Sequence, residues 1–182
     1  MDNGAGSYRR FLNGDESAFD EIMNELFFSL VFFINRYVCD VHVSEDIAIE
    51  VMSDLIVHKH RYNFKVSLKT YVFMLGRSRA LDYVRHRKLI DFVERSEIHG
   101  VANDYNDLCE TVLTDERRKN VNLAVSKLPN DMRDAVHLIY FEELSYKEAA
   151  KVMKKSVKQV DNLLYRAKKE LRIILGKDGE LL

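Results

Sequence analysis

The 182-residue sequence contains few of the residues that make tight turns or cross-links: two cysteines, one proline and seven glycines. The cysteines, Cys39 and Cys109, form no CxxC pair and have no nearby histidines at ligand spacing, so neither a disulfide framework nor a zinc site is expected. A many-stranded fold needs more proline and glycine in its turns. Because leucine, lysine, glutamate, alanine and methionine recur at helical spacing, the sequence predicts an all-α protein.

Long apolar runs are also missing. The longest, residues 27–34, is interrupted by Ser29 and is far shorter than the roughly 18 residues that suggest a membrane span. The beginning of the chain, MDNGAGSYRR, shows no secretory pattern. We therefore expect a cytoplasmic protein in which residues 27–34 form part of a buried helix.

No arrangement of catalytic residues is evident. His58 and His60 are two positions apart and so do not share a helix face. The sequence shows no Ser/His/Asp pattern, no paired catalytic carboxylates and no glycine-rich phosphate loop. We expect no enzymatic activity, no cofactor and no bound metal; metal in the purified protein would instead favour an enzyme that uses these histidines.

The net charge is close to zero, with 28 basic and 29 acidic side chains, but the charge alternates along the chain. Residues 1–60 carry a net charge of −7, residues 61–90 carry +7, residues 91–116 carry −7, and residues 117–182 carry +6. Each basic segment that could contact phosphates is thus preceded by an acidic one. A single solvated surface does not require this order, although chance clustering could also produce it.

Apolar spacing predicts three helices in the first half of the chain. The first covers residues 17–39 with Ser17 as its N-cap, and the second begins at Ser44, with acidic residues in its first turn where the helix dipole favours them. The third covers residues 68–88. The expected core positions of the second and third helices are Ile47, Val51, Leu55, Leu68, Val72, Leu75, Leu81 and Val84. Residues 91–110 have no sustained period and many acids, which indicates a linker.

An acidic stripe runs along the second predicted helix. Asp46, Glu50 and Asp54 recur at i, i+4 and i+8 and therefore lie on one face. Like charges at this spacing destabilise a helix by roughly 0.2 to 0.5 kcal/mol per pair. The stripe is thus either a solvated face or a surface that meets a basic partner.

The third predicted helix combines cations with aromatic rings. Its cations are Lys69, Arg77, Arg79, Arg85, Arg87 and Lys88, and its rings are Tyr71, Phe73 and Tyr83. Rings stack on unpaired bases while cations follow the backbone, which is the chemistry of single-strand binding. Large rings are mostly buried, however, so a core position is the alternative for each aromatic taken alone.

The second half of the chain predicts a helix-turn-helix. Apolar spacing indicates a helix that ends at Pro129 and another around residues 136–140. Capping boxes at residues 145–148 (SYKE) and 156–159 (SVKQ) then mark the starts of two further helices. An Ala-Ala pair stands where these two helices would cross, as the close packing of a helix-turn-helix requires.

The last of these helices, residues 157–174, would place its N-terminal side chains nearest the bases of a major groove. Glutamine and asparagine bond adenine edges, arginine bonds guanine, and lysines contact phosphate. The candidates are Lys158, Gln159, Asn162, Arg166 and Lys169. The alternative is an ordinary helical hairpin with a solvated basic face.

Three stretches resemble the extracytoplasmic function sigma factors, a subfamily of the RNA polymerase sigma factors. Residues 44–64 (SEDIAIEVMSDLIVHKHRYNF) are similar to the core-binding helix and the loop after it, and residues 67–88 (SLKTYVFMLGRSRALDYVRHRK) to the promoter-melting helix. Residues 128–172 resemble the region that reads the upstream promoter element. The order of acidic helix, aromatic basic helix, acidic linker and LSYKEAA module is more specific than the helix-turn-helix alone.

The resemblance implies two small helical domains, residues 1–90 and 114–182, joined by an acidic linker at residues 91–113. It implies that the acidic stripe faces core RNA polymerase, whose β′ and β subunits would be the partners, and that an anti-sigma factor holds the protein inactive. It assigns the melted minus-ten element of promoter DNA to Arg61, Lys65, Lys69, Tyr71, Arg77, Ser78, Arg79 and Arg85. The helix-turn-helix candidates would read the minus-thirty-five element.

The sequence also departs from the family. Tyr71 stands where tryptophan is usual, Ser78 where asparagine is common, and Lys154 at the turn glycine, where a left-handed conformation disfavours a side chain. Asp161 and Leu163 occupy recognition positions that are often basic, so the promoter sequence is not carried over. The runner-up interpretation is a stand-alone regulator that binds duplex operators as a dimer without polymerase.

Overall fold

The structure of the protein is a computed structural model, and it describes residues 4–97 and 116–177. All regular structure within these ranges is helical, as the sequence predicts. The chain separates into two compact units, Met1–Leu108 and Cys109–Leu182, and each is described by itself.

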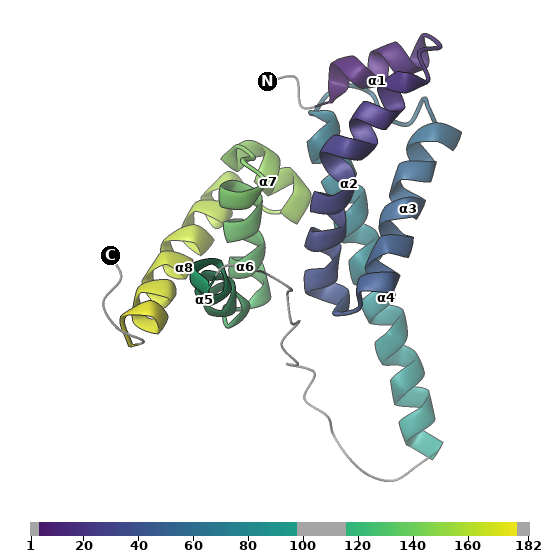
Figure 1. The fold of residues 1–182 in the computed structure, drawn as a ribbon. Coiled ribbons are helices and arrows are strands. Elements are labelled where there is room, and N and C mark those ends of the chain that lie inside the picture. The colour runs from purple at the N-terminus through teal and green to yellow at the C-terminus, as the bar shows by residue number, and fades with distance from the viewer. Residues whose placement is uncertain (1–3, 98–115, 178–182) are drawn as a thin grey trace. The chain divides into compact units, whose positions relative to one another are not determined.

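The N-terminal unit is a helical bundle. It consists of α1 (Ala5–Leu12), α2 (Ser17–Val38), α3 (Val41–Val57) and α4 (Leu68–Glu97). Figure 1 shows α2, α3 and α4 side by side, with α1 across the end where α3 finishes. The core of α2 is made of Ile22, Leu26, Leu30, Phe33 and Ile34, all fully buried. Burial of this apolar face stabilises the bundle.

Helices α2 and α4 approach closely at Gly76. A Cβ atom at this position would lie 2.6 Å from Cδ1 of Leu30, closer than two carbon atoms can pack. The ring of Phe73, one turn earlier on α4, packs against Phe33 at a centroid distance of 5.1 Å. The buried face of α4 therefore alternates large and small residues.

Two of the predicted helix caps are wrong. Ser17 is the first residue of α2, whose N-cap is Glu16, and its hydroxyl donates to Asp15 Oδ1 at 2.6 Å instead of capping the helix. Helix α3 begins at Val41, before Ser44, because Asp40 in an extended conformation accepts from the backbone N–H of Val43. The buried Ser44 hydroxyl donates to the carbonyl of Asp40 at 2.6 Å, a bond to residue i−4 that is typical of serine within a helix.

The predicted helices of the N-terminal unit need two corrections. Helix α1 was not predicted, and α4 continues past residue 88 to Glu97. Residues 91–97, expected in the linker, are therefore helical; they contain no glycine or proline that would end a helix. The rest of the predicted linker, from residue 98 to residue 113, lies outside the described residues.

The buried face of α4 differs in part from the predicted one. Leu68 and Val72 are fully buried, but Leu75, Leu81 and Val84 are half-buried. Their places in the core are taken by Phe73, Gly76 and Ala80. The predicted core positions of α3, Ile47, Val51 and Leu55, are all buried.

The C-terminal unit contains the predicted helix-turn-helix. Its elements are α5 (Glu116–Ser126), α6 (Asn130–Val136), the π-helical segment η1 (His137–Phe141), α7 (Tyr146–Met153) and α8 (Val157–Lys177). Helix α8 packs against α5, α6 and α7. The alanines of the predicted crossing, Ala149 and Ala150, are buried together with Met153, Val160 and Leu164.

Both predicted capping boxes are present. Ser145 accepts from the backbone of Glu148 at 3.3 Å, and the Glu148 carboxylate accepts from the backbone of Ser145 at 3.0 Å. At the start of α8, Gln159 donates its backbone N–H to Ser156 Oγ at 3.2 Å, and its side-chain oxygen accepts from the Ser156 backbone at 2.8 Å. These bonds satisfy the otherwise unpaired amides of each helix start.

Along the described residues, no helix has the length and apolarity needed to cross a membrane. Within the same ranges, no group of three or more His, Cys, Asp or Glu side chains could hold a metal ion. Cys39 is an exposed thiol, and Cys109 lies outside the described residues.

Candidate nucleic-acid interface

The predicted recognition residues share the solvent-exposed side of α8. Lys158, Gln159, Asn162, Arg166 and Lys169 are all exposed. The opposite side of the helix is buried through Val160, Leu164 and Ala167. The buried side holds α8 in the unit, so that the amide and cationic side chains face outward.

The capping box leaves Gln159 with half of its hydrogen-bonding capacity. Its side-chain oxygen already accepts from Ser156, and its side-chain nitrogen remains a donor for a base or phosphate acceptor. The same bond fixes the side chain against the first turn of α8. Gln159 is therefore better suited to donate to an acceptor than to form the paired bonds that recognise adenine.

Tyr165 also belongs to this surface, although it was not among the predicted recognition residues. Its ring is 74 % exposed, which is unusual for a large aromatic residue. Positions 158, 162, 165, 169 and 172 follow the spacing of one helix face. That spacing was the available signal, and it places Tyr165 between Asn162 and Lys169.

Lys168 points away from this face. Its ammonium group lies 5.6 Å from the ring centroid of Tyr140 on η1, and a hydrogen bond with Tyr140 raises the pKa of Lys168. The contact ties α8 to the preceding segment. Lys168 therefore supports the position of the helix, whereas Lys169 faces solvent.

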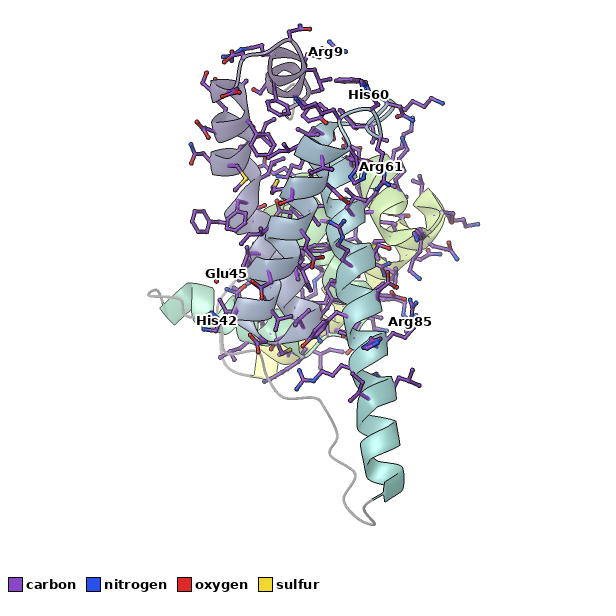
Figure 2. All side chains as sticks on the ribbon, turned by 90° about the vertical axis from the view of Figure 1, so that its right-hand side faces the viewer. Arg9, His42, Glu45, His60, Arg61 and Arg85 are labelled. Atoms are coloured by element: carbon purple, nitrogen blue, oxygen red, sulfur yellow. The ribbon has the colours of Figure 1, made fainter. Side chains whose placement is uncertain are left out.

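The residues assigned to the minus-ten element lie in two environments. Arg61 and Lys65, in the loop between α3 and α4, are exposed, as is Arg85 on α4. Figure 2 shows Arg61 beside His60 at the α1 end of the unit and Arg85 further along α4. Lys69, Tyr71, Arg77, Ser78 and Arg79, all on α4, are half-buried.

The aromatic residues of α4 divide between core and surface. Phe73 is fully buried, so the core alternative is confirmed for this ring. Tyr71 is half-buried and lies against Tyr62 of the loop, at a centroid distance of 5.1 Å. Burial raises the pKa of the Tyr71 hydroxyl.

Arg79 joins the two predicted sites of the N-terminal unit. Its guanidinium forms an ion pair with Asp54, and its Nε atom lies 3.8 Å from Glu50 Oε2. Asp54 also lies 3.2 Å from Nδ1 of His58. Arg79 thus contacts the acidic stripe of α3, while Asp46 and Glu50 stay exposed.

Comparison with known proteins gives consistent matches. Residues 118–171 match the family described as "Sigma-70, region 4". The chain is 28% identical over 166 residues to the "ECF RNA polymerase sigma factor SigM" of Bacillus subtilis, covering 87% of this chain and 95% of that protein. It is 25% identical over 170 residues to the "RNA polymerase sigma-H factor" of Pseudomonas aeruginosa, covering 89% of this chain and 88% of that protein.

Two solved structures share the fold. CnrH in complex with the cytosolic domain of CnrY has a TM-score of 0.68 at 16% identity and covers 98% of this chain and 100% of that chain. The sigma factor RpoE of Bartonella quintana, in complex with the anti-sigma factor NepR, has a TM-score of 0.64 at 19% identity and covers 88% of this chain and 98% of that chain.

Two helical units, the second a helix-turn-helix that matches sigma region 4, define a sigma-type transcription factor. The relatives to which the chain is similar over most of its length are extracytoplasmic function sigma factors, and these matches support a factor for transcription initiation by RNA polymerase.

Proposed function

We propose that the C-terminal unit reads the minus-thirty-five element as duplex DNA, with α8 in the major groove. The observation that carries this proposal is the exposed face of Lys158, Gln159, Asn162, Arg166 and Lys169 on a doubly capped helix-turn-helix. Amide and guanidinium groups would bond base edges, and the lysines would bond phosphates.

The N-terminal unit would hold the melted minus-ten strand. Arg61 and Lys65 in the loop, together with Lys69, Arg77, Ser78 and Arg85 on α4, would follow the phosphates, and Tyr71 would stack on a base. Arg79 serves this role less well, because Asp54 and Glu50 already neutralise its charge. We propose domain limits at residues 1–97 and 114–182, with a linker between them, because α4 runs to Glu97.

The acidic stripe of α3 would bind core polymerase through its β′ subunit, with β as a further contact. Asp46 and Glu50 are exposed and could meet a basic partner surface, whereas Asp54 is partly covered by Arg79. The protein itself would catalyse nothing; the polymerase would perform the chemistry in the cytoplasm. An anti-sigma factor is a second proposed partner, because RpoE was solved in complex with the anti-sigma factor NepR and CnrH in complex with the cytosolic domain of CnrY.

Co-elution with core polymerase and promoter-dependent run-off transcription test this function. We expect Asp46→Lys and Glu50→Lys to weaken both, because each variant reverses an exposed charge of the stripe. Glu25→Lys makes the same reversal at an exposed position of α2 and is the matched control. Sequence-specific duplex binding without any polymerase association would overturn the proposal and favour a stand-alone regulator.

A further inference from the structure

Helix α1 is attached to the bundle by the hydroxyl of Tyr8. The Tyr8 side chain is fully buried, and its hydroxyl shares its single proton between the carbonyl oxygen of Leu55, at 2.8 Å, and that of Lys59, at 3.2 Å. Leu55 lies in the last turn of α3, where carbonyls have no partner within the helix. Tyr8 thus closes the C-terminal end of α3 where the chain enters the loop of residues 58–67.

This loop, called here the α3–α4 loop, contains a conformation that needs support. Phe64 has a φ of 59°, a left-handed conformation that is sterically unfavourable for a residue with a side chain. Its ring lies 4.6 Å from that of Tyr62 and 6.2 Å from that of Tyr8, measured between centroids. The guanidinium of Arg9 lies over the Phe64 ring, 5.0 Å from its centroid. Residues of α1 therefore hold Phe64 in place.

Further bonds fix the backbone of the same loop. The Tyr62 hydroxyl donates to the carbonyl of Val66 at 2.6 Å, and the Asn63 side chain accepts from the backbone N–H of Lys65 at 3.1 Å. The Tyr62 ring also packs against the Tyr8 ring in an edge-to-face arrangement, with a centroid distance of 5.5 Å. The loop is thus held by bonds within itself and by the contacts of its Tyr62 and Phe64 rings with Tyr8.

The α3–α4 loop carries Arg61 and Lys65, two exposed cations of the minus-ten set, and places Tyr62 against Tyr71 of α4 at 5.1 Å. Figure 2 shows Arg9, His60 and Arg61 at this end of the unit. The buried Tyr8 sits beneath this surface and cannot touch DNA itself. Its effect on DNA would pass through the loop.

We propose that Tyr8 is a positioning residue for capture of the melted minus-ten strand: it holds the α3–α4 loop in the shape that presents Arg61, Lys65 and Tyr71 to unpaired DNA. This inference rests on the proposed function of the N-terminal unit. It gives α1 a role in promoter opening, and it separates that role from the polymerase contact on α3.

The test uses the full chain assembled with bacterial core polymerase. Tyr8→Phe keeps the ring and removes both hydrogen bonds, and Tyr146→Phe in the C-terminal unit is the matched control. Two affinities are measured for each holoenzyme: that of the sigma factor for core, and that of the holoenzyme for single-stranded DNA carrying the minus-ten element. We expect Tyr8→Phe to keep core affinity within about twofold and to lower single-strand affinity about fivefold, which corresponds to about 1 kcal/mol for the loss of one shared hydrogen-bond donor.

Amide hydrogen exchange provides a second measurement that does not depend on DNA. We expect faster exchange in residues 58–66 of Tyr8→Phe, with α2 protected as in the wild type. Equal single-strand affinity in Tyr8→Phe and wild type would overturn the positioning role while leaving the proposed function intact. A parallel loss of core affinity, or faster exchange throughout the bundle, would show a general structural role instead. If the wild-type holoenzyme fails to bind the single strand, both proposals fall.

Discussion

The guanidinium of Arg79 on α4 forms an ion pair with the carboxylate of Asp54 on α3. The pair is partly buried, with side-chain exposures of 27% for Arg79 and 22% for Asp54. It offsets the repulsion that three acids spaced four residues apart create along α3. An acidic stripe that appears unfavourable in the sequence is therefore partly neutralised within the chain.

Arg79→Ala should lower the free energy of unfolding by about 1–2 kcal/mol, between the values for exposed and for buried pairs. Urea unfolding followed by circular dichroism measures the change. Arg85→Ala is the control, because Arg85 pairs with Asp82 at 3.0 Å on an exposed surface and should cost less than about 0.5 kcal/mol. Equal effects of the two variants would contradict the special role of the Arg79 pair.

The same variants distinguish the DNA roles of the two arginines. Because Arg79 is held by acids, Arg79→Ala should change holoenzyme affinity for the minus-ten single strand less than Arg85→Ala does. A larger loss in Arg79→Ala would mean that the ion pair opens when DNA binds, and would return Arg79 to the DNA-binding set.

A second prediction concerns alkaline pH. Burial raises the pKa of Tyr8 from 10.0 to about 12, so the folded state favours the protonated hydroxyl that donates to Leu55 and Lys59. This stabilisation is complete below pH 10 and is lost as pH rises towards 12, because the unfolded chain ionises first. The difference in unfolding free energy between wild type and Tyr8→Phe should therefore shrink over this interval. A constant difference in denaturant titrations would contradict the assignment.

Much of this architecture could be predicted from the sequence, and the failures have physical causes. The helix-turn-helix was predictable because its capping boxes and Ala-Ala crossing are local signals. The N-cap at Asp40 was missed because Ser44, followed by two acids, gives the same local signal as a cap. Helix α1 is short and was not predicted; it depends on burial of Tyr8 and Phe11 against distant parts of the chain.

The candidate sites show the same limit. Spacing along one helix predicted the acidic stripe and the exposed face of α8. It could not show that Arg79 pairs with Asp54, because those residues are 25 positions apart and meet only when α3 and α4 pack. The Phe73 ring is another example: the aromatic pattern of α4 suits both stacking and burial, and only the contact with Phe33 decides between them.

A third prediction concerns the turn of the helix-turn-helix. Lys154 has a φ of 53° and ends α7 in the left-handed conformation, which glycine adopts without a steric penalty. Lys154→Gly should therefore raise the free energy of unfolding by up to about 1 kcal/mol. Lys151→Gly is the control of opposite sign, because glycine inside a helix costs about 1 kcal/mol. A destabilised Lys154→Gly in thermal unfolding would show that the lysine side chain makes a compensating contact.

The last prediction separates base reading from phosphate contact on α8. Arg166 and Lys169 are both exposed on this helix, but arginine can form paired bonds with guanine, whereas lysine more often bonds phosphate. Arg166→Ala should lower holoenzyme affinity for the minus-thirty-five duplex by about 1–3 kcal/mol and relax the preference at one base pair. Lys169→Ala should weaken binding to all sequences alike and reduce the slope of log affinity against log salt by about 1. Titrations of wild type and both variants against single-base-pair substitutions, at several salt concentrations, measure both effects. If Lys169→Ala alters base preference while Arg166→Ala changes only the salt slope, α8 is rotated in the groove by about one residue relative to the proposed orientation.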